Sequence, residues 1–349
     1  MGTEKYVITG GAGFIGSNFI RYLLQREKNI RILNFDSLTY AGNLNNLTDI
    51  EKDPRYCFVK GDICKIRKVS DVFDQFQPDY VINFAAESHV DRSILNPDVF
   101  VRSNIIGVQN LLQESLQHGV KKYVQISTDE VYGSLGKEGS FTEKTPLDPR
   151  SPYSASKASA DLLTQAYFHT FNLPINITRC SNNFGPFQFP EKLIPLTILN
   201  CIHGKKIPIY GDGLNIRDWI YVEDHCSAID RVIHHGVPGE VYNIGANNER
   251  SNIGIVTSII QTLNELRPDL HISEDLISYV EDRKGHDRRY AIDSTKIFKN
   301  LNWIPAIPFE SGLKNTILWY LDHKDWLNSV VSTDYRSYTL KEHEKNHRV

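Results

Sequence analysis

The glycine-rich stretch VITGGAGFIGS, residues 7–17, is the feature that most limits what this chain can fold into. It follows a short apolar run and opens a segment with helical periodicity, so it predicts a strand, a tight turn and a helix. Gly11, Gly13 and Gly16 satisfy the spacing G-x-G-x-x-G, and Gly10 adds an earlier glycine. Glycine at these positions lets the backbone approach a pyrophosphate, which then lies on the helix N-terminus. The stretch therefore predicts a dinucleotide-binding unit, with a glycine-rich turn that binds nothing as the alternative.

Asp36 supplies the second half of this signal. It ends the apolar run IRILNFD, twenty residues after Gly16. A carboxylate at this strand end can accept hydrogen bonds from the ribose hydroxyls of an adenine nucleotide. It would repel a 2′-phosphate, and the stretch DSLTY contains no Arg, so the sequence favours NAD over NADP. We expect Asp62 and the stretch FAAES (84–88), at the next two strand ends, to complete the adenosine site.

Short apolar runs alternate with helical stretches over the first half of the chain. The runs are rich in β-branched residues and bounded by Gly, Asp or Pro, as strands usually are. Such alternation predicts an α/β fold with a doubly wound, Rossmann-type parallel sheet. We expect strands at 5–10, 30–36, 55–62, 80–86, 121–127 and 175–185, and helices at 14–27, 64–76, 97–118 and 152–171.

The pattern becomes less regular after about residue 180. SNNFGPFQFPEKLIP, residues 181–195, has the composition of a long loop. Short strands and turns follow, then a helix from about residue 224, a strand at 239–247 and a helix at 253–266. We expect an NAD-binding domain over 1–180 to which 218–244 returns, a smaller interleaved C-terminal substrate region over 181–330 (mainly 181–217 and 245–330), and a polar tail at 331–349.

The composition argues against several classes of protein. Hydrophobic residues make up 40% and charged residues 23% of the chain, which is typical of a globular protein with a full core. The net charge of −3 gives no reason to expect a nucleic acid or an anionic membrane as partner. No apolar run approaches the roughly 20 residues that span a bilayer, and we expect no signal peptide. The five cysteines form no C-x-x-C pair and the twelve histidines no ligand spacing, so we expect reduced thiols, a cytoplasmic location and no metal.

Tyr153 and Lys157 are the first catalytic candidates. They lie at the start of an expected helix, where residues four apart share one face. The lysine can hold a nicotinamide ribose and lower the phenol pKa by its charge, so that the tyrosine acts as a base. The pairs Tyr56–Lys60 and Tyr320–Lys324 have the same spacing but lie in a strand and far down the chain, respectively. A surface tyrosine and lysine are the alternative for the first pair too.

Asp129 and Glu130 follow Thr128 at the end of the expected strand 121–127. The carboxyl ends of the strands are where ligands bind to an open α/β sheet. Two adjacent carboxyls beside a buried cofactor cannot both ionise cheaply, so we expect one of them to stay protonated and to titrate together with the other. A solvated turn or a helix N-cap is the alternative.

TGGAGFIG, STDEVYG, SPYSASKASAD and GHDRRYAID together resemble the extended short-chain dehydrogenase/reductases. More narrowly they resemble the nucleotide-sugar 4,6-dehydratases of the dTDP-glucose type, which DSLTYAGNL and AAESHVDRS support. The resemblance covers nearly the whole chain to about residue 330. It implies an NAD-dependent hydro-lyase that converts dTDP-glucose, or alternatively UDP-glucose, to the 4-keto-6-deoxy sugar. It also implies a homodimer through the helices near 97–118 and 152–171.

The resemblance further implies a role for each catalytic candidate. Tyr153 would deprotonate the sugar 4-hydroxyl while NAD accepts the C4 hydride, with Lys157 holding the ribose and Thr128 bonded to the sugar oxygen. Glu130 would then remove the C5 proton, and protonated Asp129 would donate to the departing C6 hydroxyl. The hydride returns to C6.

The resemblance carries over to cofactor and substrate contacts. Planar guanidinium groups suit a diphosphate, because they can contact two oxygens at once. Position 284 is Lys where the family usually has Pro, which could perturb its loop or add a cation near the phosphates. For NAD the implied residues are Gly10, Gly13, Phe14, Ile15, Gly16, Asp36, Ser37, Leu38, Thr39, Asp62, Ile63, Phe84, Ala85, Ala86, Ser88, Ser103, Tyr153, Lys157 and Asn183; for the nucleotide sugar they are Ser88, Thr128, Asn182, Lys192, Leu193, Pro208, Tyr210, Arg217, Asn252, Arg283 and His286.

Three rival functions stay open at this point. A nucleotide-sugar 4-epimerase needs the tyrosine, the lysine and NAD but no adjacent carboxylates. A decarboxylase or a GDP-mannose-type dehydratase usually keeps the second carboxylate without the first. A non-catalytic NAD-binding protein would be expected to have lost at least one of the five catalytic candidates. The choice between thymine and uracil depends on one methyl group, worth about 1–3 kcal/mol in a pocket, and residue types do not decide it.

Overall fold

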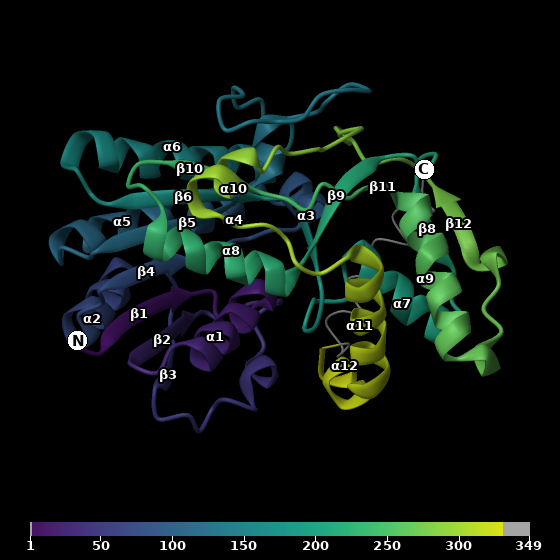
Figure 1. The fold of residues 1–349 in the computed structure, drawn as a ribbon, viewed down its shortest axis with the longest axis horizontal. Helices are drawn as coiled ribbons and strands as arrows, with labels where there is room; N and C mark the ends of the chain where they lie inside the picture. The colour runs from purple at the N-terminus through teal and green to yellow at the C-terminus, as the bar shows by residue number, and fades with distance from the viewer. Residues whose placement is uncertain (1, 331–349) are drawn as a thin grey trace.

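A seven-stranded parallel sheet forms the larger part of the structure, a computed structural model that describes residues 2–330 (Figure 1). The strand order is β10-β6-β5-β4-β1-β2-β3, so the chain runs outward from β1 to β3 and then returns to β4 on the other side of β1. Such a reversal opens a crevice at the carboxyl ends of the strands. The expected doubly wound sheet is confirmed. Its strands are β1 (Glu4–Thr9), β2 (Ile30–Asp36), β3 (Tyr56–Lys60), β4 (Tyr80–Asn83), β5 (Lys122–Thr128), β6 (Ile175–Cys180) and β10 (Val241–Ile244).

Helices cover both faces of this sheet (Figure 1). Along β1, Tyr6 and Ile8 lie in one apolar cluster and Val7 lies in another, because successive side chains point to opposite faces. Both faces are buried, which explains why the strands are apolar nearly throughout. The first cluster includes side chains of α1 (Phe14–Arg26), α8 (Val222–His235) and α10 (Thr295–Leu301); the second includes side chains of α2 (Ile66–Phe76), α5 (Gly107–Gln117) and α6 (Pro152–Phe171).

The start of α6 is fixed by a capping box. The Ser151 hydroxyl accepts a hydrogen bond from the Ser154 amide (3.0 Å), and the Ser154 hydroxyl accepts one from the Ser151 amide (3.0 Å). Pro152 occupies the first helical turn, where no donor is lost. These contacts set the position of Tyr153 at the carboxyl edge of the sheet.

The single helix expected at 97–118 is divided, and a short helix precedes it. α3 (Val90–Leu95) and α4 (Pro97–Val101) lead into a wide π turn, η2 (Arg102–Ile106), before α5 begins. The buried Asn104 in this turn donates to the Ser156 hydroxyl on α6 (2.8 Å). That hydrogen bond ties the wide turn to the helix that carries Tyr153.

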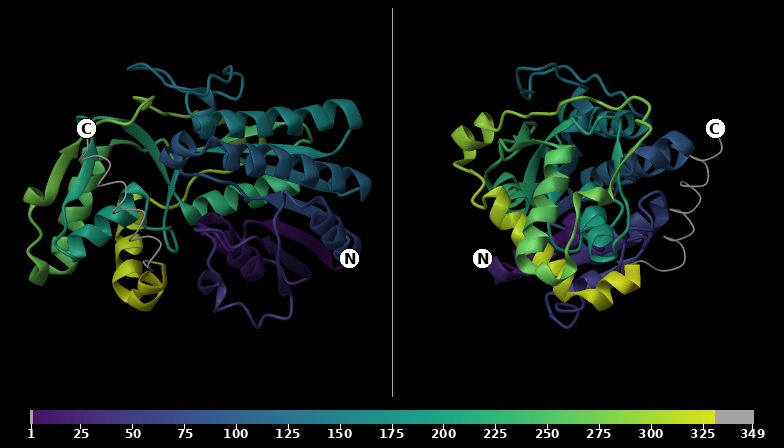
Figure 2. Two further views of the ribbon diagram at one scale, coloured as in Figure 1. Left: turned by 180° about the vertical axis from the view of Figure 1, so that it is seen from behind. Right: turned by 90° about the vertical axis from the view of Figure 1, so that its right-hand side faces the viewer.

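The smaller part of the structure has its own apolar core, built from short strands and helices (Figure 2). β8 (Ile207–Tyr210) pairs with β12 (Ile277–Val280) in a two-stranded sheet. Its other strands are β7 (Asn182–Phe184), β9 (Ile216–Tyr221) and β11 (Glu249–Ser251), and its helices are α7 (Leu193–Ile202), α9 (Asn252–Leu266), α11 (Phe309–Asp322) and α12 (Lys324–Val330). Four short 3₁₀ turns complete the structure: η1 (Leu44–Leu47), η3 (Asp129–Tyr132), η4 (Pro268–Leu270) and η5 (Glu274–Leu276).

The chain crosses between the two parts more than once. β10 joins the large sheet beside β6, whereas β9, also inside the expected returning segment 218–244, pairs with β7 and β11. The expected loop 181–195 contains β7 and the start of α7, because Pro195 lies in the first turn of that helix, where proline is tolerated. We keep the domain division as a proposal, with the return to the sheet beginning at α8. The expected tail 331–349 lies outside the described residues.

Lys284 lies in a turn that proline would suit. The His286 amide donates to the Arg283 carbonyl (3.2 Å), and Gly285 between them has φ +67°. This is the pattern of a type II turn, in which proline is favoured where Lys284 stands. Within residues 2–330 the Lys284 amide donates no hydrogen bond. The turn therefore closes without the proline that the family resemblance led us to expect.

We predict that Lys284→Pro stabilises the protein by about 0.4–1 kcal/mol, because it restricts the unfolded chain and breaks no hydrogen bond. The measurement is the free energy of unfolding from chemical denaturation. Gly285→Ala is the matched control and should destabilise, since its φ disfavours a side chain. Destabilisation by Lys284→Pro would show that the turn is not of this type.

Candidate active site

A cavity of about 1580 Å³ lies along the carboxyl ends of the sheet strands and continues into the smaller part. Every predicted site residue lines it except Leu38. The Leu38 amide instead donates to Asp36 Oδ1 (2.8 Å) from a left-handed backbone conformation (φ 54°), so this residue shapes the loop from behind. The contact between Leu38 and NAD that the resemblance implies stays a prediction.

The turn between β1 and α1 has room for a ligand and none for side chains. Gly10 has φ +68°, and a Cβ there would lie 2.5 Å from the Ala85 amide nitrogen. A Cβ on Gly16 would lie 2.5 Å from the Gly10 carbonyl oxygen. Gly13 is the N-cap of α1 and offers no side chain to the first amides of the helix. Those amides stay available for an anion, as a pyrophosphate requires.

Asp36 is buried beside this turn. Its Oδ2 accepts from the Ala12 amide (2.9 Å), and its Oδ1 accepts from the Leu38 amide. Burial raises the pKa of Asp36, and the two amide bonds oppose that rise. Each carboxylate oxygen has a second lone pair that can accept from a ribose hydroxyl. The glycine turn and this carboxylate together fit the adenosine diphosphate half of NAD.

Tyr153 and Lys157 point from the first turns of α6 into the same cavity, and both are buried. Lys157 Nζ donates to the Ile126 carbonyl on β5 (2.6 Å). Burial raises the pKa of Tyr153 well above its usual value, and the charge of Glu130 adds to the rise. Burial lowers the pKa of Lys157, while Asp161 opposes the change. In the protein alone, therefore, the phenol pKa is raised, whereas the sequence argument expected Lys157 to lower it.

Asp129 and Glu130 form the first residues of the turn η3, directly after β5. The Thr128 hydroxyl accepts from the Glu130 amide (3.3 Å) and lies 3.3 Å from Asp129 Oδ1, to which it can donate. Asp129 is 1% exposed, and its Oδ2 has no hydrogen-bond partner within the described residues. The pair thus enters the cavity at a strand end and is not a solvated turn.

The two carboxyls have different electrostatic surroundings. Burial raises the pKa of Asp129 well above its usual value, Glu130 and Asp218 raise it further, and Arg217 alone among the cations opposes the rise. Burial also raises the pKa of Glu130, but Arg217, Lys192 and Arg283 oppose that rise. The surroundings therefore favour the protonated form more strongly at Asp129 than at Glu130.

The three cations of the smaller part that act on Glu130 form one wall of the cavity. Arg217 donates to the Ile216 carbonyl (2.8 Å) and to the Asp287 carbonyl (2.9 Å). Lys192 donates to the Ser88 carbonyl (3.1 Å). The third, Arg283, forms an ion pair with the carboxylate of Asp91 in the main-sheet part. Such a wall can bind a diphosphate.

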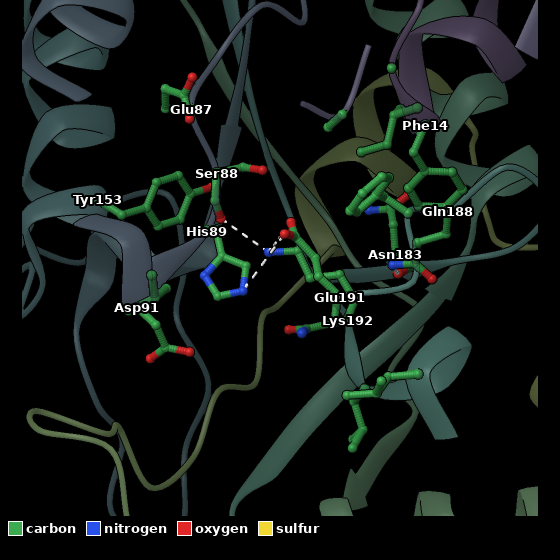
Figure 3. A pocket seen from close by; sticks show the side chains of 18 of the residues that line it. Phe14, Glu87, Ser88, His89, Asp91, Tyr153, Asn183, Gln188, Glu191 and Lys192 are labelled. Atoms are coloured by element: carbon green, nitrogen blue, oxygen red, sulfur yellow. Dashed lines mark hydrogen bonds and ion pairs between the residues drawn. The ribbon is translucent and has the colours of Figure 1, made fainter. Parts of the chain in front are cut away.

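Sequence reasoning missed several polar residues of the cavity. Figure 3 shows His89 facing Glu191 and Lys192, with Tyr153 on the other side. His89 Nε2 lies 3.8 Å from Glu191 Oε2, and the Tyr40 hydroxyl donates to Glu191 Oε1 (3.2 Å). Burial lowers the pKa of His89 to about 2, so this imidazole is neutral. The sequence did contain a signal for two of these residues. His89 lies in AAESHVDRS and Tyr40 in DSLTYAGNL, and each stretch follows a strand end, but we used both stretches only as support for the resemblance.

Two expected absences concern metals and membranes. Across residues 2–330, no three His, Cys, Asp or Glu side chains are grouped so that they could hold a metal ion. In the same part of the chain, no helix has both the length and the apolar character needed to span a bilayer.

Comparisons with known proteins agree with this geometry. The family model for GDP-mannose 4,6 dehydratase matches residues 7–316. A dTDP-glucose 4,6-dehydratase of Neisseria meningitidis is 50% identical over 347 residues, covering 95% of this chain and 98% of the relative. The crystal structure of the dTDP-glucose 4,6-dehydratase of Bacillus anthracis in complex with NAD is 50% identical, with a TM-score of 0.86 and coverage of 94% and 99%. The enzyme of Streptomyces venezuelae, solved with NAD and TYD bound, is 44% identical, with a TM-score of 0.87 and coverage of 92% and 98%.

A family model that matches most of the chain, together with relatives of this identity, establishes that the chain belongs to the GDP-mannose 4,6 dehydratase family of short-chain dehydrogenase/reductases.

Proposed function

We propose that this protein is an NAD-dependent 4,6-dehydratase of dTDP-glucose. The observation that carries the proposal is the pair of buried Asp129 and half-buried Glu130, which lies in the same cavity as Tyr153 and Lys157. A redox step at C4 needs only the tyrosine and lysine, whereas loss of water across C5 and C6 needs an acid and a base besides them. The relatives named dTDP-glucose 4,6-dehydratase support the same reaction.

In the first step, Tyr153 is the base that takes the proton of the sugar 4-hydroxyl, and Thr128 orients that oxygen. The cofactor, when bound, would accept the hydride from C4 of the sugar and supply it to C6 after elimination, when Glu130 would give the proton that it removed back to C5. Lys157 holds the nicotinamide ribose, and its positive charge favours the phenolate once the site is filled.

Elimination follows from the unequal protonation of the carboxyl pair. The new 4-ketone acidifies the C5 proton, which Glu130 removes as the carboxylate kept ionised by the neighbouring cations. Asp129 keeps its proton and donates it to the departing C6 hydroxyl, so that water leaves. Two carboxyls in different surroundings thereby divide the acid and base roles.

The substrate class follows from the cationic wall. Arg217 and Arg283 offer paired donors to a diphosphate, and Lys192 adds a third positive charge. Tyr210 lines the same region and can stack on a base. UDP-glucose is the alternative substrate, since it differs from dTDP-glucose in the base methyl group and the ribose 2′-hydroxyl.

We propose that the protein is a homodimer. Apolar side chains on α3, η2, α6 and the end of α4 are exposed: Leu95 by 61%, Val101 by 47%, Ile106 by 44% and Leu162 by 58%. Such a concentration on neighbouring helices is typical of a surface that pairs with another protein. We also propose a cytoplasmic location, because all five cysteines are free thiols, as in a reducing compartment.

We predict that the purified protein, supplied with NAD, converts dTDP-glucose to a 4-keto-6-deoxy product. NMR should show a new C6 methyl group, and UDP-glucose tested alongside should turn over more slowly. Appearance of a C4 epimer instead would support an epimerase, and an unchanged sugar with bound NAD would support a non-catalytic protein.

We predict that Asp129→Asn and Glu130→Gln each lower the elimination rate by about 10²–10⁴-fold while leaving C4 oxidation measurable, because each removes one acid or base. The readout is single-turnover accumulation of the 4-keto, 6-hydroxy intermediate. The melting temperature of Asp129→Asn should not fall, since burial disfavours the ionised form of the carboxyl that it replaces. Elimination at the parent rate in both variants would contradict the assignment.

We predict that Leu162→Asp converts the dimer to a monomer, because it places a charge in the apolar surface of α6. Size-exclusion chromatography with light scattering gives the molecular mass. Ile304→Asp, at a residue 64% exposed outside these helices, is the matched control and should leave the mass unchanged. A monomeric parent protein would contradict the dimer proposal.

A further inference from the structure

Asp91 and Arg283 form an ion pair across the cavity. Asp91 lies on α3, which follows β4 in the main-sheet part, and Arg283 lies in the loop after β12 in the smaller part. Arg283 Nε lies 2.5 Å from Asp91 Oδ1, and Arg283 Nη2 lies 2.7 Å from Asp91 Oδ2. The two side chains are 24% and 18% exposed, for Arg283 and Asp91, and both residues line the cavity. The pair is therefore bidentate and largely shielded from water.

This arrangement uses one edge of the guanidinium group and leaves another edge available. Nε and one hydrogen of Nη2 are engaged by Asp91, so both hydrogens of Nη1 and the second hydrogen of Nη2 remain. Nη1 donates no hydrogen bond within the part of the chain that the structure describes. The Tyr210 ring, 5.2 Å from the guanidinium carbon, limits how the group can tilt. The remaining edge has the two parallel donors that a phosphate group binds.

The other two cations are held mainly by backbone carbonyls. Arg217 donates to two carbonyls, and Lys192 donates to the Ser88 carbonyl and lies 3.8 Å from Glu191 Oε1. Ser88 and Asp91 belong to the same stretch after β4, so one segment of the main-sheet part orients two cations of the smaller part. Arg283 differs because a carboxylate accepts two hydrogen bonds from it. Without that carboxylate its long side chain would have several rotamers available.

We propose that Asp91 is a positioning residue for nucleotide-diphosphate recognition: it fixes Arg283 so that the unused edge of the guanidinium group meets the diphosphate. This inference rests on the proposed function, and it adds a residue to which neither the sequence nor the mechanism had assigned a role. Binding is stronger when a donor pair is ordered before the ligand arrives.

Charge alone predicts the opposite effect. A carboxylate close to a diphosphate repels it, so removing the negative charge of Asp91 should tighten binding if charge dominated. If positioning dominates, Asp91→Asn frees Arg283 and weakens binding. The sign of the change in affinity therefore separates the two explanations.

The experiment measures dTDP binding to the NAD-loaded protein by isothermal titration calorimetry. Asp91→Asn should raise the dissociation constant for dTDP about tenfold, the usual scale for one charge-assisted contact. With dTDP-glucose it should raise KM by a similar factor and leave kcat nearly unchanged. In an Arg283→Gln background, Asp91→Asn should cause no further loss, because the group that it positions is gone.

Asp212→Asn is the matched control. Asp212 forms a bidentate pair with Arg288 (2.8 and 3.0 Å) on the exposed surface of the smaller part, outside the cavity lining. It should leave the dissociation constant, KM and kcat unchanged. This variant removes the same charge and the same kind of contact from the same part of the protein.

Each outcome has one meaning. If the parent protein binds no dTDP, the proposed function fails, and this proposal fails with it. If the parent binds dTDP and Asp91→Asn binds it equally or more tightly, the positioning role alone is overturned. An equal loss in the Arg283→Gln background would also overturn it, because the effect would then not pass through Arg283.

Discussion

The placement of two adjacent carboxyls at the end of β5, one buried and the other half-buried, is the constraint on which the rest of the site depends. An ionised carboxylate loses most of its hydration on burial, so two neighbours cannot both ionise cheaply. The surroundings decide which one keeps the proton: three cations face Glu130, while Asp129 lies nearer Asp218 and has an oxygen without a partner in the described chain. This inequality turns a repulsive pair into an acid and a base.

The fold brings those surroundings together from distant segments. The strand-order reversal beside β1 places the glycine turn, Asp36 and the carboxyl pair along one edge of the sheet. The smaller part contributes the cations, and the stretch after β4 orients two of them through Ser88 and Asp91. The site is therefore complete only where the two parts meet.

Local sequence patterns predicted much of this arrangement, because the carboxyl ends of all the parallel strands lie along the same edge of a doubly wound sheet. Gly10, Asp36 and Tyr153 could be assigned from the turn, the strand end and the helix start. Leu38 was assigned from the resemblance, but it does not line the cavity, and its amide donates to Asp36 Oδ1. Asp91 and Glu191 were missed because their partners are far away in sequence. The helices beside them also gave little periodicity to recognise, since one is short and the other begins near a proline. The raised phenol pKa of Tyr153 was missed for a related reason, since burial by several elements outweighs one nearby charge.

Infrared difference spectroscopy of the resting protein at neutral pH tests most directly whether the carboxyl pair holds one proton and where it resides. The account predicts a protonated-carboxyl band that is present in the parent protein, persists in Glu130→Gln and disappears in Asp129→Asn. A parent spectrum without that band, or a band lost in Glu130→Gln and kept in Asp129→Asn, would contradict it.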